Sequence, residues 1–317
     1  MVPASPPPEN TPIAYLSGRW VPQEQAALPV WDAGVVLGAA VAEQVRTFAQ
    51  QPFRLEEHLR RLQHSLELVG LDPELSLAQW QEICHQVVQH NVRFLAPGEE
   101  LGLVVFVTAG PYPTLFPGEA PPLGRQPTVC AHTYVLPLRR WGQLALRGVS
   151  LRIAPVRQVP PECWSPQIKA RSRLHFFLAA QWAAAQEPGA QALLLTTDGQ
   201  VAECPTANVV MLQSGRLLAP PEEVVLPGIS LRVLGELARE LGLPLEQRPL
   251  RPEELAQAEE LYITSTPYCM LPVVRVDGRA VGGGTPGPMY RRLMQAWSEL
   301  VGVDVLGQMV PEESPER

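Results

Sequence analysis

The chain has 317 residues, of which 46% are hydrophobic and 18% are charged, and its formal net charge is −7. This composition is typical of a globular protein that buries a sizeable core in one large or two ordinary domains. The acidic balance and the lack of a Lys/Arg-rich run argue against nucleic-acid partners and against a polybasic membrane-binding patch. We therefore expect small-molecule partners.

The ends of the chain and its cysteines bear on location. Residues 1–10 are Pro-rich and have neither the basic nor the apolar part of a signal peptide, and no apolar run approaches the roughly 20 residues that span a bilayer. The five cysteines are scattered and form no C-x-x-C pair, which disfavours a disulfide framework and a structural zinc site. The histidines show no metal-ligand spacing, so we expect no metal. These features predict a cytoplasmic protein.

The first half of the chain alternates strand and helix patterns. Residues 1–12 and 305–317 are polar or Pro-rich, so we expect both to be disordered tails outside the fold. Between them the first half predicts a strand, a return strand, two amphipathic helices, a nearly unbroken apolar strand and a Pro-rich loop. In chain order these elements cover residues 41–48, the segment after Pro52, residues 55–69, 77–87, 101–108 and 111–127.

The second half is more regular. It predicts a helix over 170–185, a strand, a tight hairpin turn with its return strand, a further pairing strand, a helix that Ser230 caps and Gly242 ends, a short helix, a strand, another hairpin signal and a last helix. These later elements cover residues 192–197, 198–203, 208–213, 231–241, 252–258, 261–265, 273–278 and 289–300. The class is α/β (α+β), with two domains: a smaller one over 13–138 and a larger one over 139–304.

Lys169 is the only lysine among the 25 basic residues of the chain. A guanidinium stays protonated, whereas a lysine amine can lose its proton and form a Schiff base with a carbonyl. Compositional drift toward arginine is the alternative explanation. Lys169 follows a Pro-rich loop and precedes the predicted helix over 170–185, so we expect its amine at a loop-to-helix junction.

Several groups elsewhere in the chain, taken together with Lys169, suggest a cofactor. Glu203 follows a hairpin turn, and the backbone N–H groups of Ile229 and Ser230 open a helix, which is a ready anion site. Thr266, after a predicted strand, and Arg61, on the first long helix, would add donors for the same anion. An amine, an acid and a phosphate-sized anion site are what pyridoxal 5'-phosphate requires. Each group alone also has an ordinary structural explanation, so spacing does not decide the question.

Five stretches in the right order decide it by resemblance. Residues 53–62, Ile168-Lys169, residues 198–203 with Asn208 after them, residues 226–230 and residues 258–266 resemble the class IV aminotransferases, the fold type IV pyridoxal-phosphate enzymes. That family includes branched-chain aminotransferase, D-amino acid aminotransferase and aminodeoxychorismate lyase. The resemblance covers the chain from about residue 15 to residue 300.

The resemblance implies a role for each matching residue. Lys169 would be the catalytic Schiff-base lysine, and Glu203 the carboxylate at the pyridine nitrogen. The remaining cofactor-binding residues would be Arg61, Asn208, Ile229, Ser230 and Thr266. The larger domain would then be the cofactor-binding one. The family also implies a homodimer that takes a small-molecule amino donor and an oxo-acid acceptor.

The chain departs from the family on the substrate side. The positions of the carboxylate-binding arginines of branched-chain and D-amino acid enzymes fall on Gly102 and near Ala109 of this chain. Before Glu43, where the family often has an aromatic residue, this chain has Ala42. Three functions stay open: a transaminase whose substrate carboxylate is held by Arg171, Arg173 or another arginine, a carbon–carbon lyase like the aminodeoxychorismate enzyme, and a cofactor-binding homologue without turnover.

Overall fold

The computed structural model describes residues 9–310 of the chain, which divides into two compact units. The first unit consists of Met1–Leu136 together with Ile168–Ser172, and the second of Pro137–Gln167 together with Arg173–Arg317. The chain passes from one unit to the other at Leu136, close to the domain boundary predicted after residue 138. The short segment Ile168–Ser172, however, returns to the first unit and takes Lys169 with it.

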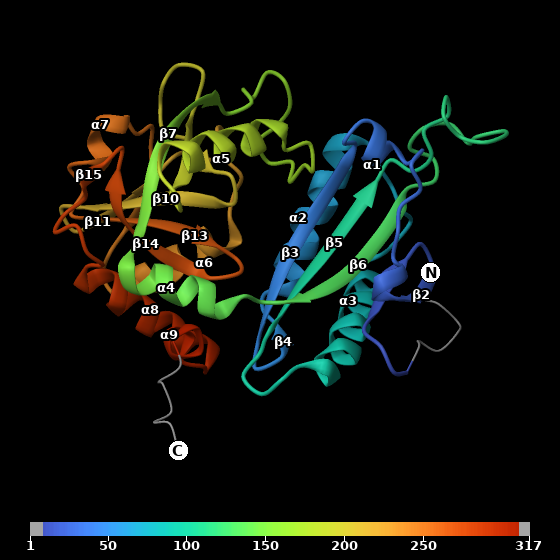
Figure 1. Ribbon diagram of the computed structural model, residues 1–317, viewed down its shortest axis with the longest axis horizontal. Helices are drawn as coiled ribbons and strands as arrows, with labels where there is room; N and C mark the ends of the chain where they lie inside the picture. Colours follow the sequence, from blue (N-terminus) through green and yellow to red (C-terminus); the bar gives the residue numbers. More distant parts are fainter. Residues whose placement is uncertain (1–8, 311–317) are drawn as a thin grey trace. The chain divides into compact units, whose positions relative to one another are not determined.

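The first unit is an antiparallel sheet of six strands in the order β2-β1-β6-β5-β3-β4, with two long helices packed against it (Figure 1). The strands are β1 (Ile13–Leu16), β2 (Arg19–Pro22), β3 (Ala40–Phe48), β4 (Gln51–Pro52), β5 (Leu101–Thr108) and β6 (Thr128–Val135). The helices are α1 (Ala33–Val36), α2 (Leu55–Val69) and α3 (Leu77–Asn91), with short 3-10 turns at Gln23–Gln25 and Val92–Phe94.

Alternation along β3 places one set of its side chains in the core of the first unit. Val41 and Val45 are 1% exposed and pack with the apolar stripe of α2, of which Leu59 and Leu62 are fully buried. Burying side chains of this size contributes about 1.5–3 kcal/mol each. Because successive residues of a strand point to opposite faces, Glu43 lies on the same buried face as these two valines.

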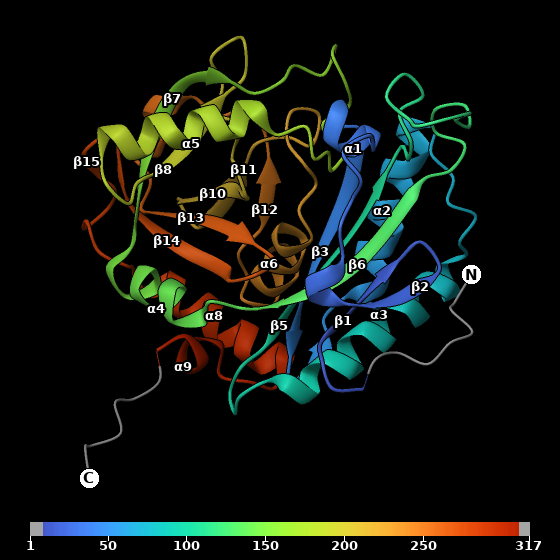
Figure 2. The ribbon, with the colours of Figure 1, turned by 45° about the vertical axis from the view of Figure 1, so that its right-hand side comes forward.

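The second unit is built on a nine-stranded mixed sheet with the path β12-β11-β10-β13-β14-β7-β8, to which β15 and β9 add at β14 and β10. Its strands are β7 (Val149–Arg157), β8 (Gln191–Leu195), β9 (Glu203–Cys204), β10 (Ala207–Gln213), β11 (Arg216–Ala219), β12 (Leu245–Gln247), β13 (Glu260–Ser265), β14 (Cys269–Val276) and β15 (Arg279–Ala280). Its helices are α4 (Leu138–Arg147), α5 (Leu174–Gln186), α6 (Ile229–Glu240), α7 (Pro252–Leu255), α8 (Pro288–Val301) and α9 (Val305–Met309). Helix α5 packs on β7 and β8, as Figure 2 shows, while α6 and α8 pack on β13.

The mixed helices and sheets confirm the predicted α/β class, and the predicted long helices and apolar strands are present. The expected tail over 305–317 is wrong at its start, because α9 buries Val305 and Met309 there. Residues 1–8 and 311–317, which make up most of the two expected tails, lie outside the described residues. Within residues 9–310, none of the helices is both long and apolar enough to cross a membrane.

Candidate active site

Lys169 lies in an extended segment that pairs with the edge of β3, not at the start of a helix as expected. The backbone N–H of Ala42 donates to the Lys169 carbonyl at 2.9 Å, and the N–H of Arg171 donates to the Ala40 carbonyl at 2.8 Å. The Lys169 N–H donates to the Ser65 hydroxyl on α2 at 3.2 Å. Helix α5 begins only at Leu174. The backbone of the single lysine is therefore fixed by both β3 and α2.

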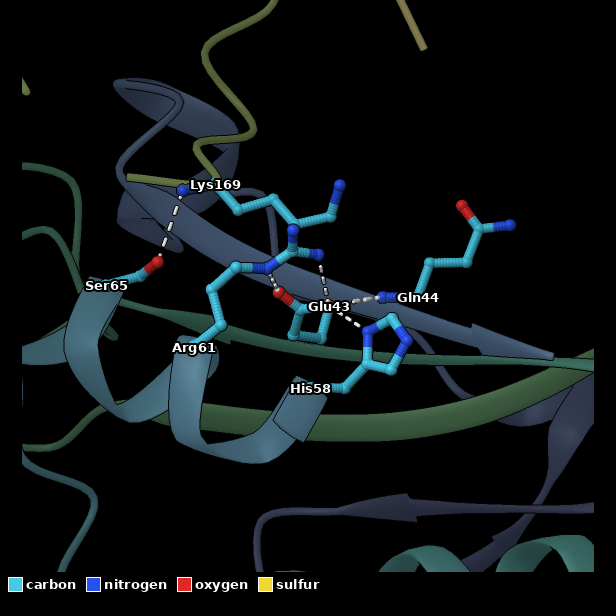
Figure 3. A network of polar contacts seen from close by, with 6 residues as sticks. All are labelled: Glu43, Gln44, His58, Arg61, Ser65 and Lys169. Atoms are coloured by element: carbon cyan, nitrogen blue, oxygen red, sulfur yellow. Dashed lines mark hydrogen bonds and ion pairs between the residues drawn. The ribbon is translucent and has the colours of Figure 1, made fainter. Parts of the chain in front are cut away.

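Beside Lys169, α2 and β3 enclose a buried ion pair (Figure 3). Arg61 donates from Nε to Glu43 Oε1 at 2.7 Å and from Nη2 to Glu43 Oε2 at 2.9 Å. His58 Nδ1 lies 2.7 Å from Glu43 Oε2. The Glu43 side chain is 0% exposed and that of Arg61 10%. A two-point bond of this kind fixes the plane of the guanidinium as well as its position.

The charges in this cluster determine its protonation. Burial by itself would raise the pKa of Glu43, but the Arg61 charge and the His58 hydrogen bond outweigh burial and lower that pKa well below its ordinary value. Burial lowers the pKa of His58 despite Glu43, and the charges of Arg61 and Lys169 lower it further. His58 is therefore neutral near pH 7. Because an ionised carboxylate only accepts, the proton of His58 sits on Nδ1.

Glu203, in β9 of the second unit, is also buried, with 8% exposure. Gln158 donates from Nε2 to Glu203 Oε1 at 2.6 Å, and His175 Nε2 lies 3.2 Å from Gln158 Oε1. Burial, followed by the charge of Arg173, lowers the pKa of His175. A chain of side chains thus leads from α5 to the carboxylate. Glu203 was predicted from its hairpin position and the family resemblance, whereas no sequence pattern indicated Gln158 or His175.

The turn at the start of α6 has the properties of an anion site. Asn208 donates from Nδ2 to the Leu226 carbonyl at 2.9 Å, and a Cβ on Gly228 would overlap Asn208 Oδ1. Gly228 is the N-cap of α6 and provides no capping side chain. Ser230 is therefore in the first helical turn and is not the cap that the sequence analysis expected. The first N–H groups of a helix have no partner within it, so those of Ile229 and Ser230 suit an anion.

Strand β13 ends beside this turn. Asn208 and Thr264 are register partners across β10 and β13, and Thr264 is 2% exposed. The Thr264 hydroxyl is buried without a hydrogen-bond partner in the described part of the chain. Thr266 follows the strand and is half-buried. The structure thus gathers Asn208, Ser230 and Thr264 in the second unit, whereas Arg61 and Lys169 belong to the first.

The chain matches one family of known proteins over most of its length: residues 40–276 match the family described as amino-transferase class IV. A D-alanine aminotransferase from Bacillus licheniformis is 29% identical to it, over 88% of this chain and 94% of the relative. A putative branched-chain-amino-acid aminotransferase from Methanocaldococcus jannaschii is 28% identical, over 90% of this chain and 95% of the relative.

Solved structures agree with this match. The T.th. branched-chain amino acid aminotransferase, crystallised with pyridoxamine 5'-phosphate, superposes with a TM-score of 0.82 at 24% identity, over 92% of this chain and 94% of that one. The branched-chain amino acid aminotransferase of Escherichia coli gives a TM-score of 0.81 at 25% identity, over 92% and 95% of the two chains. The two-unit architecture is therefore the one these enzymes share.

Proposed function

Because the chain belongs to the class IV aminotransferases, a family of enzymes that use pyridoxal phosphate, we propose that it transfers an amino group between an amino acid or amine and a 2-oxo acid, with Lys169 as the covalent cofactor residue. The observation that carries the proposal is the position of Lys169. It is the only lysine of the chain, and it lies within the family match beside the Arg61–Glu43 ion pair.

The residues present fit this cofactor. When bound, pyridoxal phosphate supplies an aldehyde that condenses with primary amines and a ring that accepts electrons from the reacting carbon. The turn before α6 and the buried Thr264 hydroxyl, which has no hydrogen-bond partner within residues 9–310, supply donors of the kind that a phosphate group needs. Glu203, buried beside Gln158, is a carboxylate in a setting where it can hold a proton on the ring nitrogen.

Each residue then has a defined task. We assign to Arg61, Ile229, Ser230 and Thr266 the binding of the phosphate, with the guanidinium of Arg61 oriented by Glu43. Asn208 holds the turn that carries Gly228, so its contribution to cofactor binding is one of position. Lys169 Nζ can both bond to the cofactor and carry a proton to and from the reacting carbon, because an amine can be neutral and a guanidinium cannot.

A second copy of the chain is the partner that we propose for α5. This helix exposes the apolar side chains Leu174, Phe177 and Leu178, which are 69%, 58% and 48% exposed. Apolar side chains clustered on one helix face are typical of a protein–protein contact. Analytical ultracentrifugation of the wild type and of a Phe177→Asp variant tests the homodimer, which the charge should weaken.

We also propose a cytoplasmic location. All five cysteines are free, and Cys84, Cys130, Cys204 and Cys269 are buried while Cys163 is exposed. Free thiols of this kind persist in reducing compartments. Fractionation of the cells that make the protein tests the location.

The absorbance of the bound cofactor tests the function. Purified protein mixed with pyridoxal phosphate should absorb in the visible range, and an amino donor without an acceptor should convert that absorbance to that of the aminated cofactor. Release of pyruvate and aminobenzoate from aminodeoxychorismate would instead indicate the lyase, and binding without either reaction would indicate a homologue without turnover. Lys169→Arg keeps the positive charge and should abolish the bound absorbance; a variant that retains it would overturn the assignment of Lys169.

A further inference from the structure

The face of the first unit's sheet that points away from α2 carries polar and cationic side chains. Arg46, Gly102 and Tyr134 are register partners across β3, β5 and β6, and Gln44, two residues before Arg46, is on the same face, as is its row partner His132. Val41 and Glu43 point to the opposite face, toward α2. None of these cross-strand rows contains a carboxylate, and Arg46 contributes a guanidinium to the face.

Tyr134 is fixed on this face by its neighbours. Its ring lies directly over Gly102, where a Cβ would overlap it, and its hydroxyl oxygen accepts a hydrogen bond from Gln44 Nε2. A tyrosine hydroxyl has one proton to donate. Because its oxygen serves Gln44, the Tyr134 O–H remains available as a donor to a ligand. Burial raises the pKa of Tyr134, so the hydroxyl keeps that proton at neutral pH.

Arg171 adds a guanidinium to the same group. The bridge between Ala170 and Val41 places Lys169 and Arg171 on either side of the bridge residue, so both side chains leave the segment on the same side. Figure 3 shows the Lys169 side chain extending on the same side of β3 as Gln44. In an extended segment the Cα atoms of Lys169 and Arg171 are about 7 Å apart. A substrate that is bound near Lys169 Nζ could therefore reach the Arg171 guanidinium.

The positive charge of Arg171 changes the pKa values of sheet residues, but none of these residues is a carboxylate that would neutralise it. Burial lowers the pKa of His132, and the Arg171 charge lowers it further; the same charge opposes the rise that burial causes in the pKa of Tyr134. Over residues 9–310, the guanidinium of Arg171 forms no salt bridge with a carboxylate. A cation on the same face as a fixed phenol O–H, close enough for its charge to act on that hydroxyl and without a salt bridge over residues 9–310, suits the binding of an anion.

We propose that Arg171 and Tyr134 bind a carboxylate of the substrate, so that the enzyme prefers carboxylate-bearing amino acids and oxo acids to uncharged amines. The inference rests on the proposed function for the identity of the ligand. It also accounts for Gly102, where the sequence resemblance places an arginine in branched-chain relatives. A side chain at residue 102 would displace the Tyr134 ring, and Arg171 supplies the cation from a different segment.

Calorimetry with two unreactive ligands of the same shape tests the site. 4-Methylpentanoate and 4-methylpentanamide are titrated into the protein loaded with pyridoxal phosphate. The wild type should bind the carboxylate at least about 10-fold more tightly than the amide, because a charge-assisted bond is the stronger one. Arg171→Leu should weaken binding of the carboxylate by roughly 10- to 100-fold and leave the amide within about 3-fold. Arg171→Lys should recover part of the loss.

The controls separate this inference from the proposed function. Arg60→Leu, which removes an exposed arginine of α2, should change neither affinity. Tyr134→Phe should weaken carboxylate binding while preserving the ring over Gly102, and it replaces Arg171→Leu as the test if that variant does not fold. Equal losses for carboxylate and amide, or no loss for either, would overturn the site. If no amino donor converts the wild-type cofactor, the proposed function fails, whereas the ratio of the two calorimetric affinities still decides the inference.

Discussion

Replacing Glu43 by glutamine should destabilise the first unit far more than the loss of an ordinary surface charge. The change leaves the Arg61 guanidinium, which is 10% exposed, without the carboxylate that it contacts at 2.7 and 2.9 Å. Removing one member of a buried ion pair costs about 3–5 kcal/mol. Charges about 4 Å apart interact by about 4 kcal/mol at an effective dielectric constant of 20, which agrees with that range. Glu56→Gln is the matched control, because it breaks an exposed pair with Arg60 and should cost at most about 0.5 kcal/mol.

The assay is hydrogen exchange of the β3 and α2 amides in increasing urea, since it reports the free energy of unfolding of this unit alone. The pKa of Glu43 is lower in the folded chain than its ordinary value of 4.5, so its stabilising contribution is complete above that value and is lost only as the pH falls toward the folded pKa. The gap between wild type and Glu43→Gln should therefore stay constant from about pH 5 to 8 and narrow in more acidic solution. A loss no larger than that of Glu56→Gln, or a gap that closes near neutral pH, would refute the reasoning.

Two further changes test the second unit. Gln158→Leu removes a donor that Glu203 accepts from at 2.6 Å, so cofactor affinity should fall roughly 10-fold. Gln200→Leu removes a half-buried side chain that donates to Asp198 and should leave affinity in a fluorescence titration unchanged. Gly228→Ala places a methyl group against Asn208 Oδ1 and should weaken cofactor binding by roughly 10-fold or more. The double change with Asn208→Ala should recover part of the loss. An unaltered affinity for Gly228→Ala would contradict the geometry of the turn.

Elements whose packing face follows from local periodicity were predictable. Helix α2 shows its stripe at spacings of three and four, and β5 is an apolar run, so the predicted bounds of both agree with the structure. Helix α4 was missed because Gly142 interrupts its pattern; the glycine is needed where the Met309 carbonyl packs against it. Strand β6 was missed because it mixes threonine, histidine and tyrosine with its apolar residues.

The start of α5 and the position of Lys169 show a different limit. The Ala-rich segment after Lys169 has a helical composition, yet its first residues pair with Ala40 and Ala42, about 130 positions earlier in the chain. Local propensity contains no information about such a partner. Glu43 did leave a trace in the sequence, since it is the one acid between Val41 and Val45 on the apolar face of a strand. An acid in that place indicates a buried partner of opposite charge.

The single lysine and the many arginines now have a common explanation in this part of the molecule. Arg61 must stay charged to hold Glu43 in its buried position, and a guanidinium stays charged because its pKa is about 12 or higher. The proposed task of Lys169 is the opposite one, to lose and regain a proton, which a guanidinium cannot perform. Arg171, two residues later, again needs only a constant charge to attract a carboxylate. Exchanging the two cation types should therefore impair different properties. Arg61→Lys should lose the planar two-point contact with Glu43. Lys169→Arg should lose the covalent bond to the cofactor and the proton transfer.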